Sequence, residues 1–154
     1  MASDLCTSVL GPTQEPCRGL ECLIGRGRFG VPVEFVQQVV ELEVGLAPPL
    51  SLPWVGGVGL HEGRALVSIA LLPLPGPTKR SIKGVWLGLR GSPTDFVLEV
   101  TRVASFVEAQ VQQKTVSIGR LRLPSYVTAA FTSASRSIGW VHVASMLREL
   151  AGVG

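Results

Sequence analysis

Apolar and polar positions follow a short-range pattern along most of the chain. Brief apolar runs are separated by turns rich in glycine and proline, which is typical of strands joined by tight turns. These runs cover 20–24, 29–31, 55–60, 64–72, 82–89, 96–103, 106–107, 126–131 and 138–143. About nine short strands are therefore predicted, as in a small all-β barrel protein.

Two segments depart from this pattern and predict helix. Pro32 suits a first helical position, and Val33, Val36 and Val40 follow at helical spacing. Because the segment is rich in valine, one or two turns of helix passing into a strand are expected. At the other end, residues 143–150 carry apolar side chains at i, i+3, i+4 and i+7, which predicts a terminal helix.

Prolines and composition shifts suggest how the chain is divided. Residues 1–18 show neither period and contain two prolines, so a flexible N-terminal tail is expected. The proline cluster at 73–77 reads as a linker between two halves of one domain, 19–154. The halves differ in charge, with 4 basic and 7 acidic side chains in 1–77 against 10 and 4 in 78–154.

Composition excludes several classes of protein. With 46% hydrophobic and 16% charged residues, the chain is neither disordered nor a coiled coil. No apolar run approaches the roughly 18 residues that span a bilayer, so no membrane insertion is predicted. A secretory signal is not expected either. The three cysteines fit no disulfide framework or zinc pattern, which favours reduced thiols and a cytoplasmic location.

The candidate catalytic motifs are weak. Residues 25–30 match G-x-G-x-x-G, but Val31-Pro32 follows at once, so a hairpin turn is favoured over a dinucleotide site. Neither His61 nor His142 has a cysteine or carboxylate at metal-ligand spacing. The chain is therefore predicted not to be an enzyme, with no catalytic residues, metal or cofactor.

A nucleic-acid-binding barrel is the alternative. It would use the basic C-terminal half, with Arg120, Arg122 and Arg136 beside a tryptophan on one face. No run of lysine or arginine supports it, so nucleic acid is not the expected partner.

The order of segments resembles that of the chemotaxis coupling proteins of the CheW type. The segments that carry the likeness are 29–40, 53–67, 96–103, Tyr126–Ala129 and Val141–Leu150, and together they extend over about residues 19–151. Each motif is weak alone, and their order and spacing carry the resemblance.

The departures from the family pattern concentrate in one turn. Where the family has Asn-Leu-Arg-Gly, this chain has Gly59-Leu60-His61-Glu62-Gly63. Glu62 therefore reverses the charge of the family's arginine, or His61 takes that position if the turn is one residue longer. Ala70 replaces a family aspartate, Gln38 an acidic residue and Ala129 a glycine.

The resemblance implies two intertwined, five-stranded SH3-like barrels with a hydrophobic seam. The first barrel would hold roughly 30–80 and the second 19–29 plus 81–154. The implied function is a non-enzymatic cytoplasmic adaptor that couples the cytoplasmic tip of a chemoreceptor (a methyl-accepting protein) to a histidine kinase regulatory domain. The departures suggest that the kinase contact is weakened or replaced.

The resemblance also implies the partner-binding residues. A receptor-facing groove would use Val33, Val36, Gln38 and Val40 with Val58, Leu60 and Glu62. The kinase contact would use the strands from Leu60 to Val67, including His61 and Arg64. The competing interpretation, that the valines are simply core, applies to each of them.

Overall fold

The computed structural model describes residues 16–45, 55–71, 80–88, 95–115, 117–118, 121–134 and 136–150. The strands and helices in these ranges are β1 (Cys17–Ile24), β2 (Gly27–Pro32), a 3-10 turn η1 (Val33–Phe35), β3 (Val36–Val44), β4 (Val55–His61), β5 (Arg64–Ile69), β6 (Arg80–Leu87), β7 (Asp95–Val100), β8 (Arg102–Thr115), β9 (Ser117–Ile118), β10 (Leu121–Arg122), β11 (Val127–Thr132), β12 (Ser137–Val141) and α2 (Val143–Leu150).

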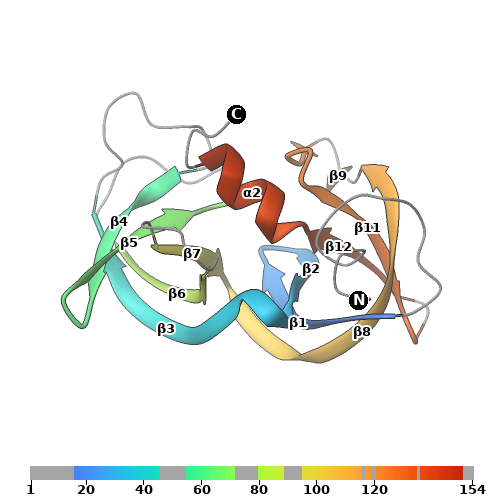
Figure 1. Cartoon of the computed structure of the whole chain (residues 1–154), viewed down its shortest axis with the longest axis horizontal. Helices are drawn as coiled ribbons and strands as arrows, with labels where there is room; N and C mark the ends of the chain where they lie inside the picture. The colour runs from blue at the N-terminus through green and yellow to red at the C-terminus, as the bar shows by residue number, and fades with distance from the viewer. Residues whose placement is uncertain are drawn as a thin grey trace.

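Ten of the strands form two closed barrels that lie side by side (Figure 1). Barrel A has the strand order β1-β2-β12-β11-β8, and barrel B has the order β3-β4-β5-β7-β6. One parallel pair occurs in each barrel, β12 with β2 and β5 with β7. The expected all-β architecture of twin five-stranded barrels is confirmed.

The barrels are intertwined because the chain passes between them twice. It enters barrel B through η1 and returns to barrel A at Thr101, which separates β7 from β8. The predicted division at the proline cluster is wrong, since β6 and β7 belong to barrel B and pair with β3 and β5. The apolar run 96–103, expected as one strand, is therefore two strands in different barrels.

The ends of the predicted elements shift only slightly. The expected tail, 1–18, is shorter, because Cys17 and Arg18 already belong to β1; residues 1–15 lie outside the described ranges. The early helix is the single turn η1, and the terminal helix begins at Val143 as expected.

The G-x-G-x-x-G segment forms a hairpin turn, as expected. Ile24 pairs with Gly27, and Gly25 takes a φ of 60°, in the left-handed region that glycine enters at little cost. β2 continues directly from this turn as an antiparallel partner of β1. No helix follows the glycines in this part of the chain, so the phosphate-binding geometry is absent here.

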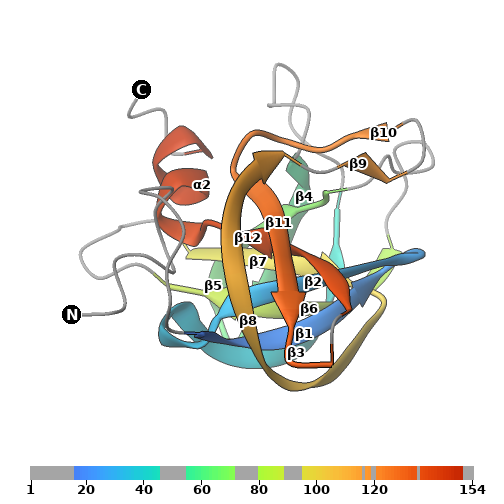
Figure 2. The ribbon, with the colours of Figure 1, turned by 90° about the vertical axis from the view of Figure 1, so that its right-hand side faces the viewer.

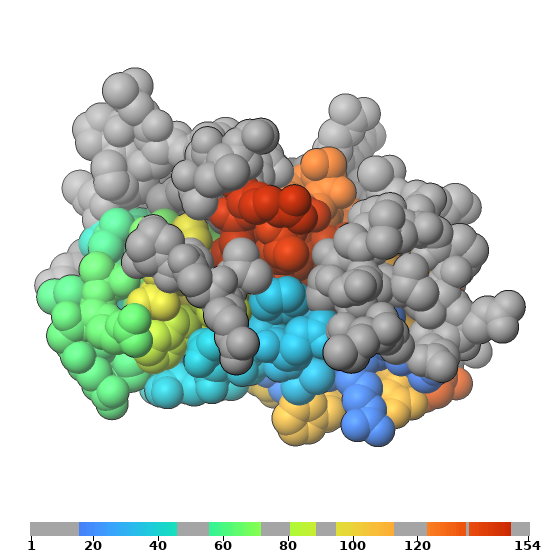
Figure 3. Space-filling model, in the orientation of Figure 1, coloured from blue at the N-terminus to red at the C-terminus, as the bar shows by residue number. Residues whose placement is uncertain are grey.

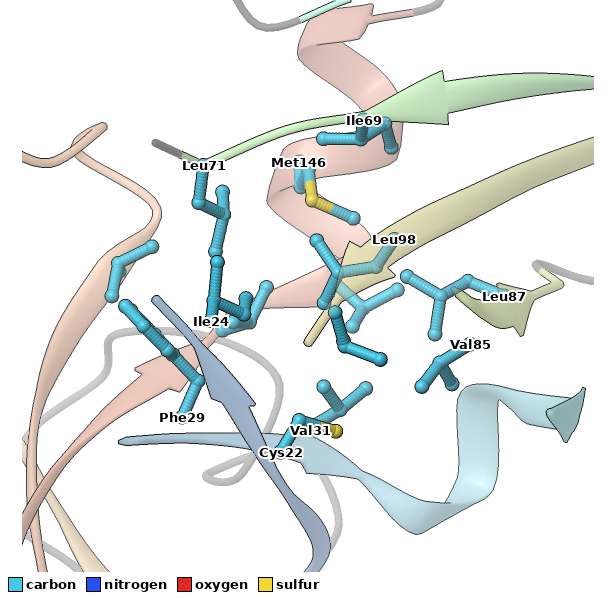
Figure 4. Packing of buried hydrophobic residues seen from close by; sticks show 14 of the residues in the cluster. Cys22, Ile24, Phe29, Val31, Ile69, Leu71, Val85, Leu87, Leu98 and Met146 are labelled. Carbon is cyan, nitrogen blue, oxygen red and sulfur yellow. The ribbon is translucent and has the colours of Figure 1, made fainter. Parts of the chain in front are cut away.

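A central core joins the two barrels (Figure 4). Cys22, Phe29 and Val31 from barrel A meet Leu87 and Leu98 from barrel B. The apolar face of α2 packs on the same core through Val143, Met146 and Leu147. This contiguous burial is the expected hydrophobic seam, and it holds the barrels together as one unit.

Candidate functional site

A groove opens on barrel A beside η1, the segment that links the two barrels. It has a volume of about 480 Å³ and is lined by Arg18, Gly19, Val33, Phe106, Val107 and Glu108. Phe106 is 76% exposed and Val33 is 38% exposed, which is unusual for large apolar side chains. We call this feature the inter-barrel groove.

Local structure explains why these side chains reach solvent. Pro32 has φ −54° and ψ 129°, and the chain then turns through η1, none of whose residues is buried. On β8, Phe106 lies opposite Leu20 of β1. Arg18 and Glu108 border the groove and approach to 3.5 Å, so an apolar floor is flanked by a charged pair.

The β4–β5 hairpin presents a second apolar surface. Val58 pairs with Val67 and Leu60 with Ala65, so these side chains share one face of the hairpin. Leu60 is 71% exposed and Val58 is 36% exposed. The hairpin projects at the lower left of Figure 3. We call this surface the hairpin face.

The tip of the hairpin is a tight two-residue turn. His61 pairs with Arg64, which leaves Glu62 and Gly63 at the two central positions with φ of 50° and 80°. Positive φ at both positions defines the type I′ geometry that suits a hairpin. Glu62 therefore projects from the tip, with its side chain 82% exposed.

A polar and aromatic network covers the adjacent end of barrel B. The His61 ring meets the Trp86 ring edge-on at 6.0 Å, and the Arg64 guanidinium lies 5.3 Å from the Trp86 centroid. Arg64 also forms a 2.8 Å ion pair with Asp95, while Gln38 Nε2 lies 3.3 Å from His61 Nε2. Arg64 and His61 are thus held by contacts within barrel B.

The sequence-predicted residues do not form one continuous groove. Val33 lines the inter-barrel groove, whose described lining includes no residue of β4 or β5. Val58, Leu60 and Glu62 belong instead to the hairpin face and its tip. Gln38 is exposed and joins the barrel B network.

Three of the predicted valines are wholly or partly core. Val40 is only 4% exposed and packs with Leu42 and Leu66 inside barrel B, so its expected place in a surface groove is wrong. Val36 and Val67 are partly buried against the central core. For Val40 the reason is that side chains alternate between the two faces of β3, and Val40 lies on the face that points into barrel B.

The residues expected of a nucleic-acid-binding barrel are engaged elsewhere. Trp140 is fully buried, and Trp86 is covered by Arg64. Arg136 is bound to the buried Glu21 carboxylate at 3.0 Å. Trp54, Arg120 and the side chain of Arg122 lie outside the described part.

Several buried polar side chains are paired with one another. Thr128 Oγ1 lies 2.7 Å from His142 Nε2 where β12 meets α2. Ser68 donates a hydrogen bond to Glu99 inside barrel B. Within the described ranges, no cluster of three or more histidine, cysteine or acidic side chains is placed to hold a metal ion.

The cysteines differ from the expected set of reduced thiols. Cys17 is disulfide-bonded, whereas Cys22 is free and fully buried. Burial, with a smaller contribution from Glu21, raises the pKa of the Cys22 thiol from 9.0 to about 12. Such a thiol is a poor nucleophile.

The described part of the chain thus combines twin five-stranded barrels with exposed apolar surfaces. The structure is similar to the crystal structure of the scaffolding protein TtCheW from Thermoanaerobacter tengcongensis, with a TM-score of 0.57 and 14% sequence identity. The match covers 82% of this chain and 88% of that one. The resemblance to CheW-type proteins is therefore confirmed at the level of the fold.

No protein-family model matches the chain, and the search of curated proteins finds no match. No helix among the described residues is long and apolar enough to cross a bilayer.

Phe106 is the main site residue that sequence reasoning missed. Its apolar character predicts burial, and the alternation of β8 is obscured by a register shift between Glu21 and Cys22 of its partner β1. The only available signal was the polar surroundings of Phe106, with Ser105 before it and Glu108 after it.

Proposed function

We propose that this protein is a non-enzymatic cytoplasmic adaptor of a chemosensory system. In this proposal the inter-barrel groove receives the helical signalling tip of a chemoreceptor, and the hairpin face contacts the regulatory domain of a histidine kinase. The twin-barrel fold, shared with a scaffolding protein, supports this assignment. Fold similarity alone does not define partners, so the two exposed surfaces carry the assignment of partners.

The exposure of Phe106 and Val33 in the inter-barrel groove carries the proposal. A helical partner docks by laying apolar side chains into an apolar groove, and this groove offers such a floor with charges beside it. Aromatic side chains, phenylalanine included, are enriched at the centres of protein interfaces, where the exposed Phe106 would become buried.

The hairpin face suits a different partner. Leu60, Val58 and Ala65 form an exposed apolar strip along the hairpin, which suits contact with the outside of another barrel. The two surfaces share no described residue, so a partner on one does not compete for the contact residues of the other. Simultaneous binding is what an adaptor requires.

The test is binding to a soluble fragment of a methyl-accepting chemoreceptor signalling tip, measured by interferometry on the full chain. Phe106→Asp and Val33→Asp are each expected to weaken binding at least about tenfold, because an uncompensated charge enters an apolar contact. Phe131→Asp is the matched control, since Phe131 is a 41% exposed phenylalanine on β11 and is not among the groove residues.

The proposal is tested by comparing the binding of the three variants to the receptor tip. Loss in the groove variants with binding retained by Phe131→Asp supports the proposal, provided that circular dichroism shows intact β structure. Absence of binding by the wild type, or equal loss in all three variants, contradicts it. Val36→Asp is unsuitable, because Val36 packs against the central core and its replacement destabilises the fold.

A further inference from the structure

The end of barrel A near the β1–β2 turn carries a concentration of arginines. Arg26 lies in that turn, Arg28 on β2, Arg102 at the start of β8 and Arg136 just before β12. All four are exposed residues. Figure 2 shows the β1–β2 turn, the start of β8 and the end of β11 on the same side of the barrel. We call this feature the arginine mouth.

Strand register brings Arg28 and Arg102 to the same face. Both pair with Leu23, Arg28 from β2 and Arg102 from β8. Side chains of residues directly opposite each other in antiparallel strands point to the same side of the sheet. The Cα atoms of Arg28 and Arg102 lie one strand spacing to either side of Leu23, or about 10 Å apart. Gly25 N donates a 3.0 Å hydrogen bond to Thr101 Oγ1, which fixes the turn to β8.

A buried carboxylate orients the other pair. Glu21 is 1% exposed, and its Oε2 accepts hydrogen bonds from Arg28 Nη1 at 2.7 Å and Arg136 Nη1 at 3.2 Å. Arg136 Nη2 donates to Oε1 at 3.0 Å. Each guanidinium retains further N–H donors, and the two side chains remain 41% and 44% exposed. Their free donors are thus held close together at the surface.

The local charge is not balanced. Glu21 offsets one of the four arginines, and neither Arg26 nor Arg102 forms an ion pair with any residue that the structure describes. Guanidinium groups bind carboxylates and phosphates in a forked geometry, and those of Arg28 and Arg136, which Glu21 holds in place, lose little side-chain entropy on binding. The arginine mouth therefore has the properties of an oxyanion-binding site.

We propose that the arginine mouth binds an acidic polypeptide segment of a protein partner, with carboxylates contacting Arg102, Arg26 and the outer edges of Arg28 and Arg136. The contacts with Glu21 show that the guanidiniums of Arg28 and Arg136 can donate hydrogen bonds to a carboxylate at this position. Nucleic acid is disfavoured, because the two tryptophans in the described part of the chain, Trp140 and Trp86, are buried or covered by Arg64 and cannot stack on bases. The site is separate from both surfaces of the proposed function.

The test uses a fluorescently labelled octaglutamate peptide and the full-length protein, with binding followed by fluorescence anisotropy. Binding is expected at about 50 mM salt and should weaken strongly at about 300 mM, because the contacts are exposed charges. The double variant Arg26→Gln/Arg102→Gln is expected to bind about tenfold more weakly. It leaves Glu21 and its two partners intact, so the fold is preserved.

Arg18→Gln is the matched control for net charge. Arg18 is an exposed arginine on β1, the strand that carries Glu21, but it pairs with Glu108 beside the inter-barrel groove. The single variants Arg26→Gln and Arg102→Gln each remove one positive charge, as Arg18→Gln does. If the peptide is attracted only by net positive charge, all three variants lose binding equally, and that result would overturn the proposal. So would absence of binding at low salt, or tighter binding of a labelled single-stranded oligonucleotide than of the peptide. Retained binding by Arg18→Gln with loss in the mouth variants supports it.

Discussion

Arg136 donates hydrogen bonds to both carboxylate oxygens of Glu21, from Nη1 to Oε2 at 3.2 Å and from Nη2 to Oε1 at 3.0 Å. The two residues are 115 positions apart in the chain. The contact ties the first strand of barrel A to the entry of β12, the strand that closes onto β2 as a parallel partner. Two charge-assisted hydrogen bonds in a forked geometry are among the stronger polar contacts in proteins. This pair therefore helps to close barrel A.

Replacing Glu21 by glutamine is expected to destabilise the protein by roughly 2–3 kcal/mol. The amide cannot satisfy both arginines, and it leaves a buried group with mismatched donors. The measurement is the free energy of unfolding in urea. Glu108→Gln is the control, because its pair with Arg18 is exposed and should contribute at most about 1 kcal/mol. Equal effects of the two changes would contradict the structural role of Glu21.

Gly30→Ala is expected to cost roughly 1–3 kcal/mol. A Cβ at Gly30 would lie 2.6 Å from Cε3 of the fully buried Trp140, so the indole has to shift within a packed core. Gly45→Ala is the control, since its Cβ would approach no described atom closer than 3.7 Å. Chemical denaturation of both variants checks this, and a neutral result for Gly30→Ala would show that Trp140 has room to move.

Strand-forming segments were predictable because each is a local pattern. The hairpins at Gly25 and Glu62 and the terminal helix follow from turn residues and apolar spacing alone. The division into barrels was not predictable in this way, because the parallel pairs β2–β12 and β5–β7 join strands that are distant in the chain. Nothing in the run 96–103 marks Thr101 as the point where the chain changes barrel.

The candidate site was predictable only in part, for the same reason. Glu62 is exposed because it lies in the tight turn at the tip of the hairpin, and Leu60 lies on the outer face of the same hairpin. The fate of Val40 and Phe106 depends on which face of the strand meets a core, and that is decided by distant strands. The arginine mouth likewise forms only when β1, β2, β8 and β12 meet.

Glu62→Asn is expected to stabilise the hairpin by roughly 0.5–1 kcal/mol. Glu62 has a φ of 50°, a region in which asparagine is far better tolerated than glutamate. Thermal unfolding gives the measurement. Glu62→Gln is the matched control, because it removes the same charge and keeps a side chain that disfavours this conformation. If both variants show the same midpoint, charge rather than backbone conformation governs the turn.

Glu62→Arg is expected to raise the recovery of a histidine kinase regulatory domain in a pull-down about tenfold. The proposed kinase contact includes this tip, and restoring the positive charge of the resembled family removes an unfavourable charge from the interface. Arginine disfavours positive φ about as glutamate does, so stability should stay unchanged. Glu108→Arg makes the same change of charge on β8 and should leave recovery unaltered. Unchanged recovery with Glu62→Arg would show that Glu62 does not oppose the kinase.

Stability should fall above pH 9 in a way that depends on Cys22. Burial raises the pKa of this thiol in the folded protein from 9.0 to about 12. Below pH 9 the thiol is protonated in both states, so its contribution to stability is complete there. As the pH rises above 9, the unfolded chain loses this proton while the folded protein keeps it, and the contribution is lost progressively up to about pH 12.

The measurement is urea unfolding of the wild type and of Cys22→Ala between pH 8 and about 10.5. The wild type is expected to lose roughly 1 kcal/mol more per pH unit above pH 9 than the variant, in which no thiol titrates at this position. Lysine and tyrosine titrate in both proteins, so their effect cancels in the difference. The variant should have a constant deficit below pH 9, because it leaves a small cavity in the central core. If the two curves remain parallel through pH 10, the folded protein exposes Cys22 to solvent, and the barrels do not share the dry core through which they are joined.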